Sequence, residues 1–319
     1  MMHILLTGGT GLIGGAVLRA LTGFHSVTVL TRDPAGARRP DLAGAAVVSG
    51  DLATLDTAVA GMAPFDALIH CAADFAAADM GAAEVPLITA LEAGRLPLAP
   101  GARVLYTGGV WLYPDGPQIF RDETSPLDPL PAFAWMVDHW RRIADLPHID
   151  AVMIHPGLVF DSAGRGAIAP WIAALEDGRP VPVIGDAGIR WPMVHADDLA
   201  DLYRRALTGL PRGESVNAVA VSGVPIDAVI RALAARRGVA RPVIETVPVS
   251  AAVAAEGPAA AGFARSQRID ARKARRDLGW TPCRPVPHLD PPISTPPIST
   301  PLGGGPNRGG AALPSLSDA

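Results

Sequence analysis

The sequence is poor in lysine and cysteine. Of its 27 basic residues only Lys273 is a lysine, so any chemistry that needs a lysine amine has one candidate in the chain. The two cysteines, Cys71 and Cys283, are too few for a disulfide framework or a cysteine-ligated metal cluster. The composition therefore argues against a small disulfide-stabilised fold and predicts no metal site. Such sparse cysteine usage is typical of the reducing cytoplasm.

The chain also lacks a strong charge bias and a long apolar run. Its formal net charge is −4, which gives no basic surface of the kind that binds nucleic acid. No apolar run reaches the roughly 18 residues of a membrane span. Residues 2–7 lead straight into a strand pattern rather than a signal peptide. We expect a cytoplasmic monomer or homodimer with a small-molecule substrate and no nucleic-acid or membrane partner.

Short apolar runs alternate with helical stretches through the first half of the chain. The predicted strands lie at residues 2–7, 27–30, 45–48, 67–70, 103–106 and 151–154. The predicted helices lie at residues 12–21, 53–61, 80–93 and 133–146. This alternation is typical of right-handed parallel βαβ units. The sequence therefore predicts an α/β protein with a doubly wound parallel Rossmann sheet.

The remaining sequence predicts a smaller substrate-binding region and a tail. Residues 1–160 are predicted to form the Rossmann domain, completed by residues 195–221. Residues 161–194 and 222–284 are predicted to form the substrate-binding region at its C-terminal side. Residues 285–319 are rich in proline and glycine and cannot bury a core, so they are predicted to be disordered.

A glycine-rich turn joins the first predicted strand to the first predicted helix. Its sequence is Thr7-Gly8-Gly9-Thr10-Gly11-Leu12-Ile13-Gly14. Gly8 permits the tight turn, Gly11 lets the backbone approach a pyrophosphate, and Gly14 lets helix and strand pack closely. The free amides and the dipole at the helix N-terminus can then hold the phosphates. The turn predicts a dinucleotide-binding site.

The end of the second predicted strand indicates which dinucleotide binds. NAD sites usually place a carboxylate there to accept the ribose 2′-hydroxyl. This chain has Thr31-Arg32 instead, with Arg38 and Arg39 a few residues further on. A guanidinium pairs well with a 2′-phosphate and can stack on adenine. The sequence therefore favours NADPH over NADH.

Further motifs resemble the extended and atypical branch of the short-chain dehydrogenase/reductases, often called NAD-dependent epimerase/dehydratases. The likeness covers about residues 2–284. The motifs that carry it, besides the glycine turn, are Gly50-Asp51-Leu52, Asp66-Ala67-Leu68-Ile69-His70-Cys71-Ala72-Ala73, Asp122-Glu123-Thr124-Ser125-Pro126, His155-Pro156-Gly157-Leu158-Val159-Phe160, Val194-His195-Ala196-Asp197-Asp198-Leu199-Ala200 and Leu278-Gly279-Trp280-Thr281-Pro282.

The resemblance implies cofactor contacts beyond the turn and Arg32. Asp51 would contact the adenine amino group, and Thr107 is also assigned to the cofactor. The other residues that the resemblance assigns to the cofactor are Leu52, Cys71, Ala72, Ala73, Pro156, Gly157 and Val159.

This sequence differs from the family's usual pattern at the catalytic residues. The family uses a Ser or Thr to hold the substrate oxygen and a Tyr-x-x-x-Lys pair on one face of a helix, where the lysine lowers the tyrosine pKa. Here Gly108 stands at the usual serine position, one residue after Thr107, and no Tyr-x-x-x-Lys occurs anywhere. In the expected register the chain has Trp135 and His139. An indole N–H is not a usable acid near neutral pH.

Three functions remain open at this point. The first is an NADPH-dependent oxidoreductase resembling the atypical ketoreductases of aromatic polyketide antibiotic biosynthesis. Its cofactor would supply the hydride, and the proton would come from water, His139, Tyr113 or a phenol of the substrate. The second is a non-catalytic NADP-binding sensor. The third is a nucleotide-sugar epimerase or dehydratase, which is favoured least because such enzymes need the tyrosine base.

The candidate substrate contacts are mostly tryptophans and small residues. An aromatic lining suits a flat aromatic ketone better than a sugar nucleotide. We expect two of the five tryptophans Trp111, Trp135, Trp140, Trp171 and Trp191 to touch the ligand. The residues assigned to the substrate are Gly108, Gly109, Trp111, Trp135, Arg190 and Trp191, and those assigned to catalysis are Thr107, His139 and Tyr113.

Overall fold

The main sheet of the computed structural model has seven parallel strands in the order β11-β7-β5-β4-β1-β2-β3. The structure describes residues 1–33, 42, 44–73, 75, 79–284 and 286. The predicted α/β class with a doubly wound Rossmann sheet is confirmed, and every predicted strand falls within this sheet. The strands are β1 (His3–Thr7), β2 (Ser26–Thr31), β3 (Ala46–Ser49), β4 (Phe65–His70), β5 (Leu98–Thr107), β7 (Ile149–Pro156) and β11 (Ser215–Ala218).

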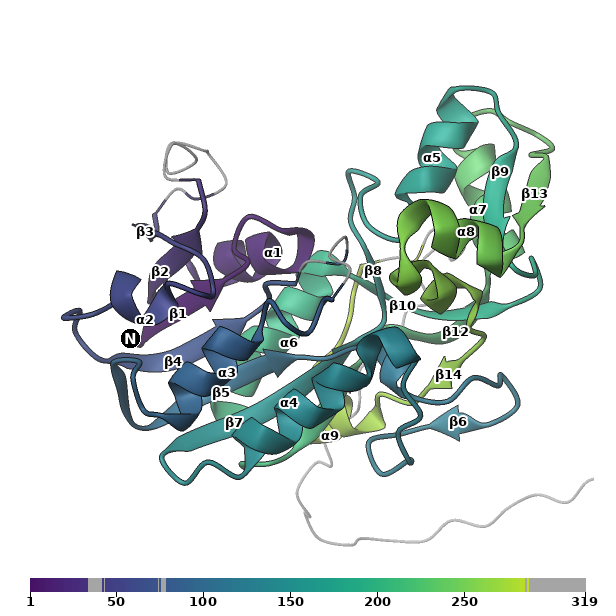
Figure 1. The fold of residues 1–319 in the computed structure, drawn as a ribbon. Coiled ribbons are helices and arrows are strands. Elements are labelled where there is room, and N and C mark those ends of the chain that lie inside the picture. The colour runs from purple at the N-terminus through teal and green to yellow at the C-terminus, as the bar shows by residue number, and fades with distance from the viewer. Residues whose placement is uncertain (34–41, 43, 74, 76–78, 285, 287–319) are drawn as a thin grey trace, which may run out of the picture.

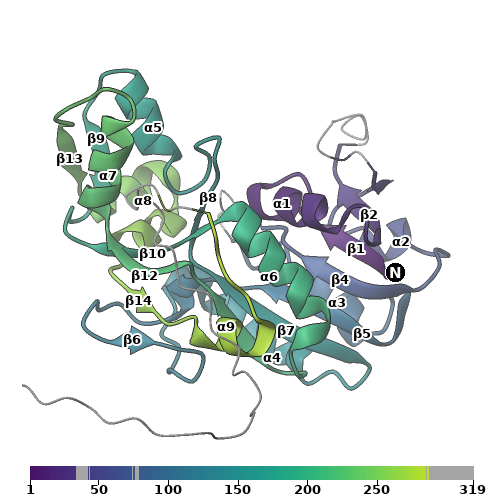
Figure 2. The same cartoon turned by 180° about the vertical axis from the view of Figure 1, so that it is seen from behind.

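Helices cover both faces of this sheet (Figures 1 and 2). Helices α3 and α4 pack together on one face, and α1 and α6 on the other. The side chains of β1 alternate between the two cores, since Ile4 and Leu6 join the α1 side and Leu5 joins the α3 side. A strand buried on both faces reads as a continuous apolar run. The helices are α1 (Leu12–Leu21), α2 (Leu55–Ala58), α3 (Val85–Glu92), α4 (Ala134–Ala144), α6 (Ala196–Gly209) and α9 (Arg272–Leu278).

A smaller lobe stands beside the sheet, at the upper right of Figure 1. It contains the three-stranded sheet β12-β10-β8 and the strand pair β13-β9, while β14 pairs with β6. Its elements and the connecting ones are η3 (Val110–Leu112), β6 (Phe120–Arg121), η4 (Pro131–Phe133), β8 (Leu158–Phe160), α5 (Ala169–Glu176), β9 (Val181–Ile184), β10 (Arg190–His195), β12 (Val221–Pro225), α7 (Ile226–Ala235), β13 (Ile244–Val247), α8 (Val249–Glu256), η5 (Pro258–Ala264) and β14 (Arg268–Ile269).

Strand β11 returns to the main sheet beside β7 after the chain has passed through the lobe. The domain limits near residues 160, 194 and 221 remain predictions. The predicted tail, residues 285–319, lies outside the described residues except for Val286, which is buried against the main core. Within the described part, no helix is both long enough and apolar enough to cross a membrane.

The strand order places a topological switch between β1 and β4. From β1 the chain proceeds outward to β2 and β3, and it then returns to the other side of β1 as β4. The loops after β1 and β4 therefore diverge at the carboxyl edge of the sheet. In doubly wound sheets ligands bind in the crevice at this point.

Candidate functional site

The glycine turn leads from the end of β1 into α1, with Gly11 as the N-cap of the helix. Gly8 has a φ of +73°, and a Cβ there would lie 2.6 Å from the backbone oxygen of Cys71. A Cβ at Gly14 would lie 2.2 Å from the Gly8 oxygen. Neither position accepts a side chain, because backbone surrounds both. The turn brings the N-terminus of α1 to the edge of two cavities.

Two cavities lie at the carboxyl edge of the sheet. The glycine-turn cavity, of about 580 Å³, lies between the turn and the ends of β2 and β3. The tryptophan cavity, of about 520 Å³, lies among the ends of β4, β5 and β7 and residues of η3, α4 and η5. Every residue predicted to bind the cofactor lines one of them except Gly14, which is buried against Gly8. Contact with a cofactor itself stays a prediction.

Arg32 and Asp51 both line the glycine-turn cavity, with Leu52 beside them. Arg32 is exposed at the end of β2 and has no ion pair among the described residues. The Asp51 carboxylate accepts hydrogen bonds from the Thr54 hydroxyl (2.8 Å) and backbone N–H (3.0 Å), and these bonds lower its pKa. Arg38 and Arg39 lie outside the described residues. Among its described lining residues the cavity thus has one cation, Arg32, at the end where a ribose phosphate is predicted.

Thr107 ends β5 and lines the tryptophan cavity. Its hydroxyl donates to the carbonyl oxygen of His70 (2.5 Å) and lies 2.6 Å from the hydroxyl of Tyr203. Because the one proton of Thr107 is used by His70, the hydrogen of the second contact comes from Tyr203. Burial raises the pKa of Tyr203 well above its usual value. Thr107 can therefore accept a hydrogen bond, but it can donate one to a substrate only by releasing His70.

Gly108 and Gly109 follow Thr107 on the wall of the tryptophan cavity. A Cβ at Gly108 would lie 2.4 Å from the Met153 methyl and 3.0 Å from His155 Nδ1. A Cβ at Gly109 would meet nothing within 4 Å. The space of a side chain at position 108 is thus taken by residues of β7, whereas position 109 opens into free space.

Two of the five tryptophans, Trp111 and Trp135, line the tryptophan cavity. The Trp135 indole N–H donates to the carbonyl oxygen of Ala132 (2.9 Å), so it has no proton for a ligand. The Trp111 ring packs edge-on against Phe263, at 5.1 Å between centroids. Contact of these two tryptophans with a substrate stays a prediction.

Four residues predicted for the substrate or for catalysis line neither cavity. Tyr113 is fully buried, and its hydroxyl donates to Asn217 Oδ1 (2.9 Å). Burial raises the pKa of Tyr113, so the structure argues against its role as a proton donor. Trp191 stacks on Trp171 and donates to the carbonyl oxygen of Phe263 (3.1 Å). The two others are Arg190, which donates to the Gly223 carbonyl oxygen (3.2 Å), and His139, which is buried within α4.

Sequence reasoning missed a buried acid, Glu84, which immediately precedes α3 and is 3% exposed. Its Oε1 lies 3.3 Å from His70 Nε2, and its Oε2 lies 3.7 Å from His139 Nδ1. We call these three residues the Glu84 cluster. Burial would raise the pKa of Glu84, but the charge of His70 and polar contacts with neighbouring side chains outweigh it and lower the pKa to about 2. The available signal was a lone glutamate in an apolar stretch.

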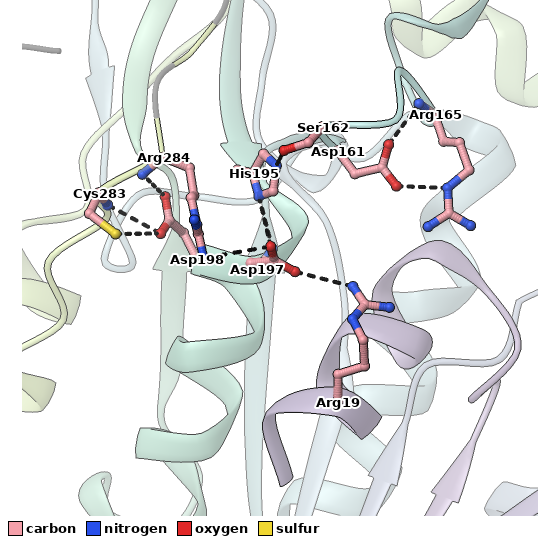
Figure 3. A network of polar contacts seen from close by, with 9 residues as sticks. All are labelled: Arg19, Asp161, Ser162, Arg165, His195, Asp197, Asp198, Cys283 and Arg284. Atoms are coloured by element: carbon pink, nitrogen blue, oxygen red, sulfur yellow. Dashed lines mark hydrogen bonds and ion pairs between the residues drawn. The ribbon is translucent and has the colours of Figure 1, made fainter. Parts of the chain in front are cut away.

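A polar network joins the lobe to the Rossmann sheet (Figure 3). His195, at the end of β10, caps α6 by accepting the backbone N–H of Asp197 at its Nδ1 (3.1 Å). The Asp197 carboxylate also pairs with Arg19 of α1 (3.1 Å). Asp198 accepts the backbone N–H groups of residues 283–284. These contacts fix α1, α6 and the last described segment relative to one another.

No group of three or more His, Cys, Asp or Glu residues within the described ranges is arranged to hold a metal ion. Both cysteines are free thiols. Burial raises the pKa of Cys71, which lines both cavities, to about 11, so its thiol stays protonated at neutral pH. The described residues therefore offer hydrogen-bonding groups and two cavities, and redox chemistry at the site would need a bound cofactor.

Comparison with known proteins identifies the family. Residues 4–221 match the model of the NAD dependent epimerase/dehydratase family, and this is more than half of the chain. The chain therefore belongs to that family, as its motifs suggest. An uncharacterized protein of Schizosaccharomyces pombe, C2A9.02, is 28% identical over 235 residues, which are 70% of this chain and 77% of that protein.

Solved structures share the fold. UDP-glucuronic acid 4-epimerase from Bacillus cereus, in complex with UDP-glucuronic acid and NAD, matches with a TM-score of 0.73 and 16% identity over 90% of this chain and 96% of that one. DesIV, the dTDP-glucose 4,6-dehydratase of Streptomyces venezuelae, has a TM-score of 0.72 and 21% identity over 89% and 93%, with NAD bound.

A third similar structure is the human epimerase family protein SDR39U1 with NADPH. Its TM-score is 0.69 at 22% identity, covering 90% of this chain and 97% of that one. At such identities the likeness shows the fold alone. Membership of this family supports a nicotinamide dinucleotide as the cofactor. The resemblance to polyketide ketoreductases is not supported by these matches and remains a hypothesis.

Proposed function

We propose that this chain is an NADPH-dependent oxidoreductase that reduces the carbonyl group of a flat, largely apolar and uncharged substrate such as an aromatic ketone. The observation that carries the proposal is the lining of the tryptophan cavity. Of its described lining residues none is Arg or Lys. Five aromatic side chains line the cavity: Phe75, Trp111, Phe133, Trp135 and Phe263.

A nucleotide sugar would bring a diphosphate into or beside this cavity. Charged oxygens that leave water need cationic or hydrogen-bonding partners, and arginine is the usual one. Arg265 is already used, since it donates to the carbonyl oxygens of Trp111 (3.2 Å) and Asp128 (2.9 Å). Arg190 is held by Gly223. The lining therefore favours an uncharged ligand.

The residues present fit a dinucleotide. The close packing around Gly8 and Gly14 leaves a bare backbone cradle at the N-terminus of α1, which suits a pyrophosphate. Arg32 would pair with a 2′-phosphate, and Pro156 and Gly157 would pack against the nicotinamide. When bound, the nicotinamide supplies the hydride. The choice of NADPH over NADH rests on Arg32 at the end of β2.

The proton of a carbonyl reduction has to come from elsewhere than a tyrosine. Glu84 is ionised near neutral pH because its pKa is about 2, and the Cys71 thiol holds its proton. Thr107 could donate to a substrate oxygen only by releasing the carbonyl oxygen of His70. Water or an acidic phenol on the substrate would then deliver the proton to the carbonyl oxygen.

Steady consumption of NADPH with a panel of aromatic ketones and quinones tests this proposal. The expected result is turnover with members of that panel and none with UDP- or dTDP-sugars. Tight NADPH binding without turnover on either panel would instead favour the sensor function. Loss of NADPH absorbance is a direct readout, and a boiled-enzyme control removes the non-enzymatic reduction of quinones.

The second candidate is a nucleotide-sugar epimerase or dehydratase. The family match and the solved structures with bound nucleotide sugars back this class more directly than they back a ketoreductase. Against it stand the absence of Tyr-x-x-x-Lys in the sequence and the lack of Arg and Lys among the described residues that line the tryptophan cavity. Conversion of a UDP- or dTDP-sugar, followed by chromatography, would establish it.

A further inference from the structure

We propose that Glu84 is a cofactor-positioning residue whose carboxylate accepts hydrogen bonds from the two hydroxyl groups of the nicotinamide-side ribose. This inference rests on the proposed function only in requiring a bound nicotinamide dinucleotide. It holds whichever carbonyl or sugar substrate the enzyme uses, because the contact is to the cofactor.

The first argument is position. A dinucleotide with its adenosine end at Arg32 and its nicotinamide end at Gly157 would have to cross the junction of the two cavities. The described residues that line both cavities are Gly11, Cys71, Ala72, Ala73, Glu84 and Trp135. Glu84 is the charged member of this set. Whatever part of the cofactor crosses the junction passes beside an ionised carboxylate.

The second argument is charge. A carboxylate repels phosphate oxygens, so Glu84 disfavours a pyrophosphate beside it. The bare backbone of the glycine turn and the N-terminus of α1 offer that pyrophosphate a separate place. The next group toward the tryptophan cavity is the ribose, with two neighbouring hydroxyl donors. Two carboxylate oxygens match two such donors, and hydrogen bonds to an ionised acceptor are the stronger kind.

The third argument is that the carboxylate is held in place. Thr7 and His70 are register partners on β1 and β4, and Thr7 Oγ1 lies 2.7 Å from His70 Nδ1. His70 Nε2 then faces Glu84 from the sheet, while His139 faces it from α4. Glu84 Oε1 is buried, and its 3.3 Å contact with His70 Nε2 does not meet hydrogen-bond geometry. A carboxylate oxygen accepts at two lone pairs, so Glu84 keeps capacity for a further donor.

A role as proton donor fits the cluster less well. Both ring nitrogens of His70 already face partners, Thr7 and Glu84, so neither is directed to a substrate. The low pKa of Glu84 keeps its carboxylate ionised and able only to accept. The cluster can therefore hold hydroxyl groups, whereas it has no proton ready to give.

The test compares a whole dinucleotide with its adenosine half. Glu84→Gln keeps the size of the side chain but removes its charge and one acceptor. We expect it to weaken NADPH binding about tenfold and to leave adenosine 2′,5′-bisphosphate binding within about twofold of wild type. If wild type prefers NADH, the two ligands to compare are NADH and ADP instead of NADPH and adenosine 2′,5′-bisphosphate. Titration calorimetry on the full chain gives both dissociation constants without any turnover.

Glu92→Gln is the matched control, because Glu92 is exposed at the end of α3 and pairs with Arg142. It should change neither dissociation constant. Equal weakening of both ligands by Glu84→Gln would show a merely structural role and overturn the inference. No change, or tighter NADPH binding from relieved repulsion, would overturn it as well.

A second measurement leaves the protein unaltered, in case Glu84→Gln does not fold. Wild type is titrated with a dinucleotide whose nicotinamide-side ribose lacks the 2′- and 3′-hydroxyl groups. Binding about tenfold weaker than that of the parent dinucleotide supports the inference, and equal binding overturns it. If wild type binds neither NADPH nor NADH, the proposed function falls together with this inference. If it binds either and Glu84 has no effect, only the inference falls.

Discussion

Acidification should destabilise this protein through His155, and replacing His155 by glutamine should remove that effect. His155 lies on β7, 2% exposed, with its ring edge-on against Tyr113. Burial lowers the pKa of His155 to about 4, against an opposing hydrogen bond with the backbone of Gly109. In the unfolded chain the pKa returns to about 6.5.

The direction of the stability change depends on whether the folded or the unfolded state binds the proton first as the pH falls. As the pH falls below about 6.5 the unfolded chain takes up a proton at His155, while the folded protein does not until the pH approaches about 4. The free energy of unfolding therefore falls through this window. The full difference corresponds to about 3.4 kcal/mol, of which about 2 kcal/mol is lost between about pH 7.5 and about pH 5.

Denaturant unfolding of wild type and His155→Gln at these two pH values measures the effect. Other groups that titrate in the window, such as His195, contribute equally to both proteins, so the difference between them isolates His155. We expect wild type to lose about 2 kcal/mol more than the variant on acidification, with equal denaturant slopes. If the two proteins lose the same stability, the argument from burial of a neutral histidine is refuted.

Four further predictions concern the site. Arg32→Ala should lower the ratio of NADPH to NADH affinity about tenfold or more, and an unchanged ratio would argue for NADH. Gly14→Ala places a Cβ 2.2 Å from a backbone oxygen and should abolish cofactor binding in titrations, while Gly109→Ala, in open space, should not. Trp111→Ala should raise KM for aromatic ketones several-fold with little change in cofactor affinity. Gly108→Ser should lower the free energy of unfolding by about 1–3 kcal/mol, read from denaturant curves, because Met153 has to move.

The sheet and the glycine turn could be predicted because their signals are local. The apolar runs are buried on both faces, and the turn residues need conformations that glycine supplies. Helix limits were less accurate. The stretch predicted as helical from residue 80 begins its helix only at Val85, because Pro86 in the first turn fixes the start. The helix predicted over 53–61 is reduced to Leu55–Ala58, ahead of Gly61 with a φ of +74°.

The residues behind the cavity walls could not be predicted in the same way. Glu84 meets His70 and His139 only because β4, α3 and α4 pack together, and no local pattern encodes that meeting. Trp191 was predicted to contact the substrate because its side chain is aromatic, but its ring stacks on Trp171 within the lobe. Sequence spacing can assign a residue to an element, whereas the direction of its side chain depends on packing among elements distant in the chain.

Gly108, at the position where the resemblance predicts a serine, belongs to a packed arrangement. The space that a serine side chain would need is filled by Met153 and His155 of β7, and His155 is in turn packed against Tyr113. Trp135, in the register where the resemblance predicts a tyrosine, donates its only polar hydrogen to the carbonyl oxygen of Ala132. Restoring one hydroxyl would therefore not restore an acid.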